Sequence, residues 1–227
     1  MDIETLIKNA PFRLSDEDIR VLRGRSDKPG PHTWEEIKSV IAAGEMGQLR
    51  RSPQDLRNYI VWHAEIRKTH GSVLEYVRRE KLRWPKHITP CDDLPFSHTN
   101  DWKVIWNDWP YDVADGIMHL VVWSKCRIEV TADSGLPTER MKHLIDSFLD
   151  REFGETLGCR RGQDLLWFKQ KTAWQSVRGL EHIHVLLLNV SRERVEKLVG
   201  QQQSQTLRVL WTRDVASTET QFSAKMS

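Results

Sequence analysis

Cysteine is scarce in this sequence, and the few cysteines present are poorly placed for cross-linking. The chain has only three, Cys91, Cys126 and Cys159. They are odd in number and widely separated, and no two form a CxxC pair, so the sequence excludes a disulfide framework and a zinc knuckle. We therefore expect the protein to work in a reducing compartment.

Long hydrophobic runs are also missing. No window approaches the roughly 18 apolar residues that a membrane-spanning helix needs. The first stretch, MDIETLIKNAPF, is acidic and lacks the basic and apolar regions of a signal peptide. We expect a cytoplasmic protein with no membrane partner, and the sequence leaves its oligomeric state open.

The formal charge is only +2, but it is unevenly distributed. Residues 50 to 86 carry ten basic and four acidic side chains. Such an excess on helices is typical of a track for phosphates, although a solvated helix face is the simpler alternative. The predicted nucleic-acid contacts are Arg50, Arg51, Arg57, Arg67, Lys68, Arg78, Arg79, Lys81 and Arg83.

Helix-start signals dominate the first ninety residues. Ser15, Thr33, Ser52 and Ser72 each precede a helical pattern, and Thr33 forms a capping box with Glu36. In the second half, Pro137-Thr138 and Ser191 are expected to open two more helices.

Short runs rich in β-branched and aromatic residues predict strands at 102–106, 116–123, 126–130, 164–168, 182–188 and 206–211. The sum is an α+β fold, in which a helical N-terminal part packs on a mixed, mainly antiparallel sheet with one or two covering helices. We expect one domain over residues 1–212, with helices in 1–90 and the sheet and its pocket in 100–212. Residues 213–227 are expected to form a frayed tail.

Histidines occupy matching positions in two predicted strands. Strand alternation puts His182 and His184 on one side of EHIHVLLLN, and it puts His119, Trp123 and Lys125 on one side of GIMHLVVWSK. If these strands are neighbours with those faces matched, three imidazoles meet. Imidazoles suit zinc or iron, but no carboxylate stands at a third-ligand spacing, so we expect no metal and no cofactor.

The segment Trp106-Asn107-Asp108-Trp109-Pro110-Tyr111 is expected to be a loop, because proline and Asn-Asp interrupt a strand. Aromatic residues around Asp108 suggest a ligand wall. The alternative is a tight turn held by tryptophans.

These motifs, NDWPY, GIMHLVVWSK, LLWFK and SVRGLEHIHVLLLN, together resemble a fungal family described as N-acetylglucosamine-induced protein or as a domain of unknown function. The resemblance covers roughly residues 50 to 190. It implies a cytosolic synthase that makes arginine-containing cyclodipeptides from arginyl-tRNA and a second aminoacyl-tRNA. The basic segment would then hold tRNA, and the pocket would hold the aminoacyl group.

Residues inside the motifs can be fitted to that activity. A guanidinium needs a carboxylate and aromatic walls, which Asp108 with Trp106 and Trp109 would supply; Asp112 and Glu181 are alternatives. The other predicted substrate contacts are Trp123, His182 and Trp167.

Acyl transfer also needs a base, oxyanion donors and a proton relay. We assign His184 or His119 as the base, Lys125 and Asn107 as donors, and Tyr111 as the relay. Aminoacyl storage would use Ser124, Cys126 or Ser176, or transfer would be direct.

Two other functions stay open. An amino-sugar-responsive binding protein would use tryptophans to stack on sugar faces. A histidine-based phosphoesterase or metalloenzyme would use the HxH pair, although Leu186 stands where the histidine-triad hydrolases have their third histidine.

Overall fold

The computed structural model of the chain describes residues 2–27, 30–171, 175 and 177–200. It divides into two compact units, residues 1–190 and 191–227. Of the second unit, the described part contains a helix over residues 192–200, which follows Ser191 as predicted. The predicted strand at 206–211 and the predicted tail lie outside the described residues.

Helices fill the first part of the larger unit. They are α1 (Ile3–Lys8), α2 (Asp16–Leu22), α3 (Trp34–Ala42), the 3-10 turn η1 (Met46–Gln48), α4 (Pro53–His70), α5 (Val73–Tyr76) and the π-helical turn η2 (Val77–Lys81). A 3-10 turn, η3 (Thr99–Asp101), precedes the sheet, and α6 (Glu139–Leu149) with the π-helical turn η4 (Asp150–Glu155) follows its second strand.

The predicted helix starts are confirmed. Ser15, Thr33, Ser52, Ser72 and Thr138 each accept a hydrogen bond from the backbone N–H three residues further on. Each cap satisfies an N–H group that the first helical turn leaves without a partner. Helix α1 was not predicted, because its single turn and a half shows little periodicity.

The sheet contains β1 (Trp102–Trp106), β2 (Ile117–Ser124), β3 (Leu165–Phe168) and β4 (Glu181–Leu188), in the order β1-β2-β4-β3. All three pairings between these strands are antiparallel. The α+β prediction is therefore confirmed.

One strand prediction is wrong. Residues 126–129 form no strand, and Val130 makes only an isolated bridge with Pro137. The Ser124 hydroxyl accepts a hydrogen bond from the Cys126 N–H at 3.1 Å and donates one to its carbonyl at 3.0 Å, so the chain turns where the apolar pattern suggested that it continued.

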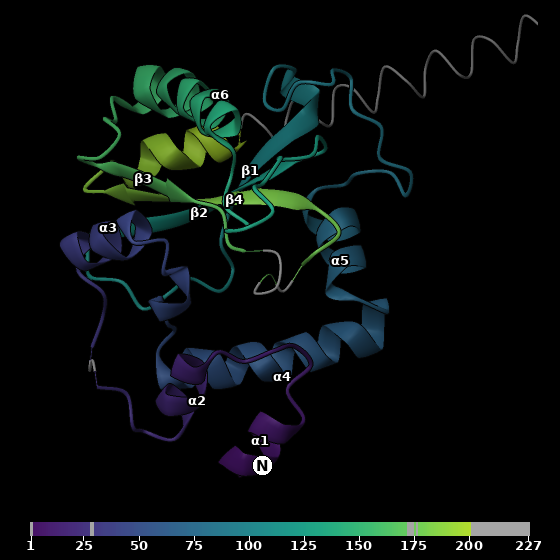
Figure 1. Cartoon of the computed structure of the whole chain (residues 1–227). Coiled ribbons are helices and arrows are strands. Elements are labelled where there is room, and N and C mark those ends of the chain that lie inside the picture. Colours follow the sequence, from purple (N-terminus) through teal and green to yellow (C-terminus); the bar gives the residue numbers. More distant parts are fainter. Residues whose placement is uncertain (1, 28–29, 172–174, 176, 201–227) are drawn as a thin grey trace, which may run out of the picture. The chain divides into compact units, whose positions relative to one another are not determined.

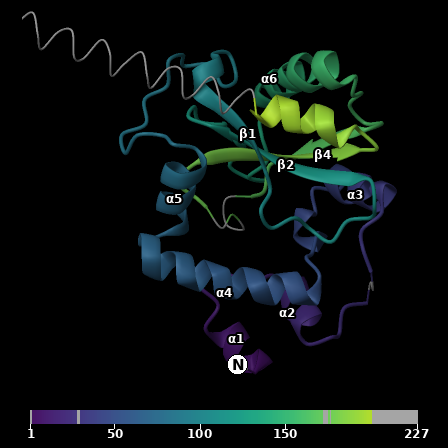
Figure 2. The same ribbon diagram turned by 180° about the vertical axis from the view of Figure 1, so that it is seen from behind.

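The two faces of the sheet are covered by different helices (Figures 1 and 2). Helix α6 covers one face, where Trp102 packs edge-on against Phe148 with ring centroids 4.8 Å apart. Helices α3, α4 and α5 lie on the opposite side, where Ile37 shares a core with Leu186 and Val77 shares another with Val121. The histidines point toward this second side.

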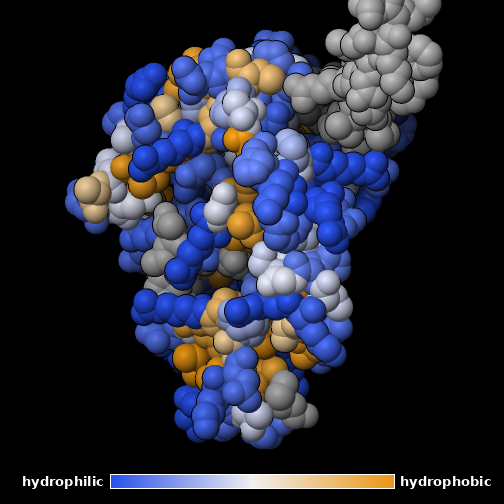
Figure 3. Space-filling model, turned by 90° about the vertical axis from the view of Figure 1, so that its right-hand side faces the viewer, coloured by the Kyte–Doolittle hydropathy of each residue, from blue (hydrophilic) through white to orange (hydrophobic). Residues whose placement is uncertain are grey.

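The surface has little exposed hydrophobic area. Val61 of α4 is the one large hydrophobic side chain that is exposed in the described part of the chain. On the face shown in Figure 3, hydrophilic residues predominate and hydrophobic ones show only in small separate groups. None of the described helices has both the length and the apolar sequence that a membrane crossing requires.

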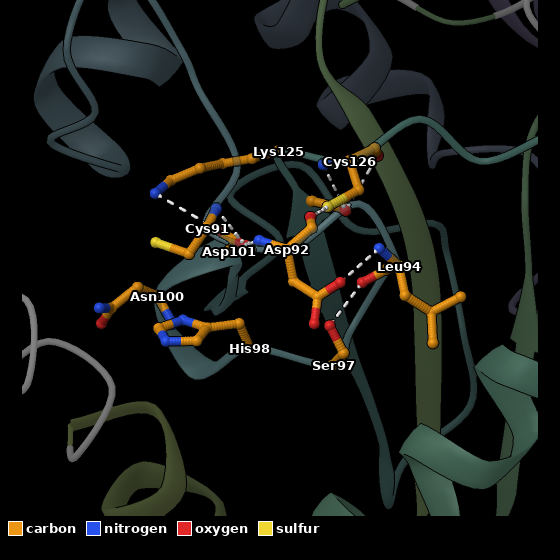
Figure 4. A network of polar contacts seen from close by, with 10 residues as sticks. Cys91, Asp92, Leu94, Ser97, His98, Asn100, Asp101, Lys125 and Cys126 are labelled. Atoms are coloured by element: carbon orange, nitrogen blue, oxygen red, sulfur yellow. Dashed lines mark hydrogen bonds and ion pairs between the residues drawn. The ribbon is translucent and has the colours of Figure 1, made fainter.

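A buried carboxylate anchors the loop that leads into β1 (Figure 4). Asp101 is fully buried and accepts hydrogen bonds from the backbone N–H groups of Cys91 and Asp92, at 2.6 and 2.9 Å. Lys125 approaches the same carboxylate at 3.3 Å. The charge of Asp101 is thus compensated on both sides, and the loop is tied to the end of β2.

We expect Asp101→Ala to lower the free energy of unfolding by about 3 kcal/mol, because it leaves two N–H groups and a largely buried ammonium without their acceptor. Urea unfolding measures this change. The control is Asp93→Ala, at an exposed position in the same loop, which should stay within about 0.5 kcal/mol of the wild type. Equal stabilities for the two variants would contradict the anchoring role.

Candidate functional site

A cavity of about 150 Å³ opens on the sheet face that carries the histidines. Its lining comes from the loop before α2, from α2, α4 and η2, from the loop after β1, and from β2 and β4. An apolar cavity of roughly this volume holds a benzene-sized molecule, so this space suits one side chain or a similar small group. We call it the sheet-face cavity.

Two histidines from neighbouring strands meet beside this cavity. Because β2 pairs with β4, Val121 lies opposite His184 and His119 lies opposite Leu186, so both histidines share one face in diagonal positions. His119 Nε2 lies 2.9 Å from His184 Nδ1, which is hydrogen-bond distance. His184 lines the cavity, while His119 lies behind it and is buried. The condition set by the sequence, adjacent strands with matched faces, is met.

Aromatic and amide groups hold this histidine pair in place. Tyr111 stacks on His119 with centroids 5.2 Å apart, and Phe168 stacks on His184 at 4.8 Å. The Asn107 amide nitrogen lies 3.2 and 3.3 Å from the two ring nitrogens of His119. These contacts therefore fix the orientation of both imidazole rings, so the pair is preorganised.

Backbone hydrogen bonds fix the segment that carries Tyr111. The Asp112 N–H donates to the Arg50 carbonyl, and the Asp112 carbonyl accepts from the His32 N–H, both at 2.8 Å. The Ala114 N–H donates to the His32 carbonyl at 2.9 Å. These bonds tie Tyr111 to the loops before α3 and α4.

Burial keeps the imidazoles neutral. Desolvation lowers the pKa of His119 to about 3 and that of His182 to about 4, and it lowers the pKa of His184 well below 6.5. The positive charge of Arg51 lowers the pKa of His119 and His184 further. At neutral pH the pair consists of two neutral rings, one donating and one accepting.

An aromatic wall lines the same cavity as His184. Tyr59 and Trp62 of α4 and Trp109 of the following loop lie with their ring centroids 5.5 to 5.9 Å apart. Trp109 was predicted in this role. Tyr59 was not predicted in this role, because it lies on the buried face of α4 and helical spacing does not show that a buried residue also reaches a cavity.

Charged side chains complete the lining. Lys81 Nζ forms an ion pair with Asp108 Oδ2 at 2.6 Å. Arg51 lies over the Tyr59 ring at 4.1 Å, and its Nε donates to the Trp109 carbonyl at 3.1 Å. Asp18 of α2 also lines the cavity, and it was not predicted there because an acidic residue in the first turn of a helix has an ordinary role in capping.

Most predicted pocket residues come together at this cavity. In addition to the residues described above, Trp106, Asn107, Tyr111, Trp123 and His182 line it. Trp167 lies on the opposite face of the sheet and donates from Nε1 to Asp146 of α6 at 2.8 Å. Lys125 is bound to Asp101, as described above, and does not line the cavity.

Two of the three predicted storage nucleophiles, Ser124 and Cys126, do not line the cavity. Ser124 is buried, with its hydroxyl bonded to the Cys126 backbone. Burial and the charges of Asp101 and Asp92 raise the pKa of Cys126 to about 11, which leaves a thiol rather than a thiolate. Ser176 lies outside the described residues.

The alternative carboxylates do not line the cavity either. Glu181 pairs with Lys169 at 3.1 Å, and the Asp112 side chain is absent from the lining.

The predicted basic track is divided among several environments. Arg50 is buried against His32 and Gly30, and Arg78 and Arg79 pair with Glu75 and Glu80. Arg67 donates to the Pro11 carbonyl. Arg57, Lys68 and Arg83 are exposed and form no ion pair with a described residue. Of the nine residues, Arg51 and Lys81 line the cavity.

Metal-binding potential is confined to another place. In the described part of the chain, Cys91, His98 and Asp101 form the one group of three metal-ligand side chains whose ligand atoms lie within 4.8 Å of each other. The Asp101 carboxylate already accepts two N–H groups and faces Lys125 (Figure 4). The histidines of the cavity belong to no such group among these residues.

The buried histidines should make the fold sensitive to mild acid. Their pKa values lie below the unfolded value of about 6.5, so below that pH the unfolded chain binds protons that the folded chain does not. The contribution of these histidines to the free energy of unfolding is then fully present above pH 6.5. Between about pH 6.5 and 4 the free energy of unfolding falls, by up to about 1.4 kcal/mol per pH unit for each histidine. Urea unfolding at pH 7.5, 6.0 and 5.0 measures this slope.

His63 supplies the matched variant. It is buried among aromatic rings, neither of its ring nitrogens is hydrogen-bonded to a described residue, and burial lowers its pKa to about 4. His63→Phe should reduce the slope by up to about 1.4 kcal/mol per pH unit, because it removes one of the buried groups whose pKa is lowered. A wild-type stability that is flat from pH 7.5 to 5.0 would contradict the neutral histidines.

Comparisons with known proteins place these residues in a family. Residues 33–188 match the model described as "Protein of unknown function (DUF3605)". The chain is 28% identical over 188 residues to N-acetylglucosamine-induced protein 1 of Candida albicans, covering 75% of this chain and 73% of that protein. It is 30% identical over 164 residues to uncharacterized protein YPL067C of Saccharomyces cerevisiae, covering 71% and 80%.

A solved structure shares the fold. "Crystal Structure of HTC1" matches with a TM-score of 0.59 and 28% identity, covering 76% of this chain and 96% of that one. The matched range of the family model includes the histidine pair, Tyr111, Arg51 and the aromatic wall. The chain belongs to the DUF3605 family.

Proposed function

We propose that the protein is a tRNA-dependent cyclodipeptide synthase, which condenses arginyl-tRNA with a second aminoacyl-tRNA into an arginine-containing diketopiperazine. The observation that carries this proposal is the preorganised pair of neutral imidazoles beside a small aromatic cavity that also contains a guanidinium. Membership in the family whose motifs suggested the activity supports it as well.

The reaction requires two acyl transfers. The amine of one aminoacyl group attacks the ester carbonyl of the other, a C–N bond forms, the C–O bond to the ribose breaks, and the ribose hydroxyl takes the proton. The remaining amine then attacks the second ester in the same way and closes the ring. Two esters become two amides, so no oxidant, reductant or metal is required for balance.

The histidine pair suits the proton movements of these steps. When His184 donates from Nδ1 to His119 Nε2, its own Nε2 carries a lone pair, and His184 lines the cavity. Because its pKa is so low, the His184 ring does not stay protonated for long. We therefore assign His184 the role of accepting a proton from the attacking amine and transferring it rapidly to the next group. The Tyr111 hydroxyl is the nearby relay, because burial raises its pKa and keeps it protonated.

Among the described storage candidates none fits the site, which favours direct transfer. Ser124 and Cys126 lie outside the cavity lining, and the raised pKa of Cys126 removes its thiolate. Both aminoacyl groups would therefore react from tRNA.

The exposed cations on α4 and after η2 would bind the phosphates of the tRNA backbone. Arg57 and Lys68 are eleven positions apart on α4, so they project from nearly the same side of the helix. Lys81 lies at the cavity and can bring a phosphate close to it. Binding should weaken with salt by roughly 0.7 to 0.9 log units per log unit of salt for each phosphate contacted.

The direct test is reconstitution with tRNA, aminoacyl-tRNA synthetases, ATP and a mixture of amino acids that includes arginine, followed by mass spectrometry. We expect an arginine diketopiperazine that disappears when the tRNA is digested with RNase. His184→Asn should lower its rate of formation by about 100-fold or more, while His87→Asn should not. Absence of the product, or a product that survives RNase, would overturn the proposal.

The aromatic wall favours a second candidate function, binding of an amino sugar. Tyr59, Trp62 and Trp109 present ring faces on which a sugar could stack. Calorimetry with N-acetylglucosamine should then give heat that Trp109→Ala abolishes. No heat at millimolar sugar would exclude this function.

A further inference from the structure

The cavity lining contains three cations, Arg13, Arg51 and Lys81, and two acids, Asp18 and Asp108. The positions of Asp18 and Arg51 are the informative ones. Asp18 of α2 and Arg51, which precedes α4, both line the cavity. Among the described residues, neither forms an ion pair within 4.0 Å, whereas the other acid of the lining, Asp108, is bound to Lys81. A carboxylate and a guanidinium that stand apart in one small cavity are complementary to a ligand with a positive group and a carboxyl oxygen.

The Asp18 side chain is held in place but retains acceptor capacity. Its Oδ2 accepts the Ser15 N–H at 2.9 Å in the capping box, and no residue in the described part of the chain donates to its Oδ1. The Arg51 side chain is also held by two contacts. The Tyr59 ring lies against the flat face of the guanidinium, and the Trp109 carbonyl accepts a hydrogen bond from Nε. The two terminal guanidinium nitrogens of Arg51 form no hydrogen bond with a described residue, so their N–H groups can donate to a ligand.

Tyr111 indicates that the two charges act on the same part of the cavity. Burial is the main cause of its raised pKa, and the negative charge of Asp18 raises the pKa further while the positive charge of Arg51 lowers it. The Arg51 guanidinium also lies 5.4 Å from the centroid of the Tyr111 ring, and Tyr111 stacks on His119 and lines the same cavity as Asp18. A ligand held between the two charges would have its carboxyl carbon near the proposed reaction site.

We propose that Asp18 and Arg51 form a two-charge subsite for the aminoacyl group, with Asp18 binding the cationic side chain and Arg51 binding the carboxyl or ester oxygen. This inference rests on the proposed function for its ligand class, and it replaces Asp108 as the partner of the cation. Asp18 precedes the range that matches the family model, residues 33–188. Selection among side chains would thus come from a segment outside that range.

The test uses L-arginine and L-citrulline, which differ only in that a neutral ureido group replaces the guanidinium. Binding is measured by calorimetry at low salt, so it needs neither tRNA nor turnover. We expect the wild type to prefer arginine by about tenfold or more, as a charge-assisted hydrogen bond would give. Asp18→Asn should abolish this preference, and Arg51→Gln should weaken the binding of arginine and of citrulline by similar factors.

Matched controls separate these effects from changes in the fold. Asp16→Asn alters the same helix at an exposed position that does not line the cavity, and Arg127→Gln removes an exposed arginine elsewhere. Both control variants should bind arginine and citrulline like the wild type. In Asp18→Asn the new amide oxygen can still accept the Ser15 N–H, so the helix cap is retained. Urea unfolding verifies that each variant is folded.

The two proposals can fail separately. No arginine binding by the wild type at millimolar ligand, no preference over citrulline, or a preference that survives Asp18→Asn would overturn the subsite. Arginine binding that depends on both residues, together with no diketopiperazine in the reconstitution, would retain the subsite and overturn the synthase.

Discussion

The antiparallel pairing of β2 with β4 is the constraint on which the site depends. Its register places His119 and His184 on one face, two positions off direct opposition, where their nitrogens come within 2.9 Å. A shift of one residue in either strand would send one histidine to the face covered by α6. The pairing is also central to the sheet, since β1 and β3 each bind one of these two strands.

Burial gives this geometry its chemical character. The helices on the histidine side desolvate the rings, so charged imidazolium is disfavoured and the pair stays neutral. The same low dielectric strengthens the effect of the charges that remain, Arg51 and Asp18, on any bound group. Aromatic rings on α4 and in the loop after β1 close the space around them. A neutral proton-transfer pair and a polarised, aromatic-walled cavity are therefore consequences of one packing arrangement.

Local signals predicted most of this fold and part of the site. Helix starts were found because a capping serine or threonine acts on residues three positions away, and the histidine faces were found because alternation is local to a strand. Contacts between distant segments had no such signal. Lys125 continues the alternation of β2, yet Asp101, twenty-four positions earlier, binds it. The turn at Cys126 and the cavity role of Asp18 were missed for the same reason, since an apolar run and an acidic first turn already had ordinary explanations.

The central claim is that His119 and His184 share a proton as two neutral rings, and histidine-selective ¹⁵N NMR tests it most directly. Spectra at pH 5.5, assigned with single His→Asn variants, should show both rings neutral, each with one protonated and one bare nitrogen. An imidazolium signal from either residue of the pair at this pH would contradict the account.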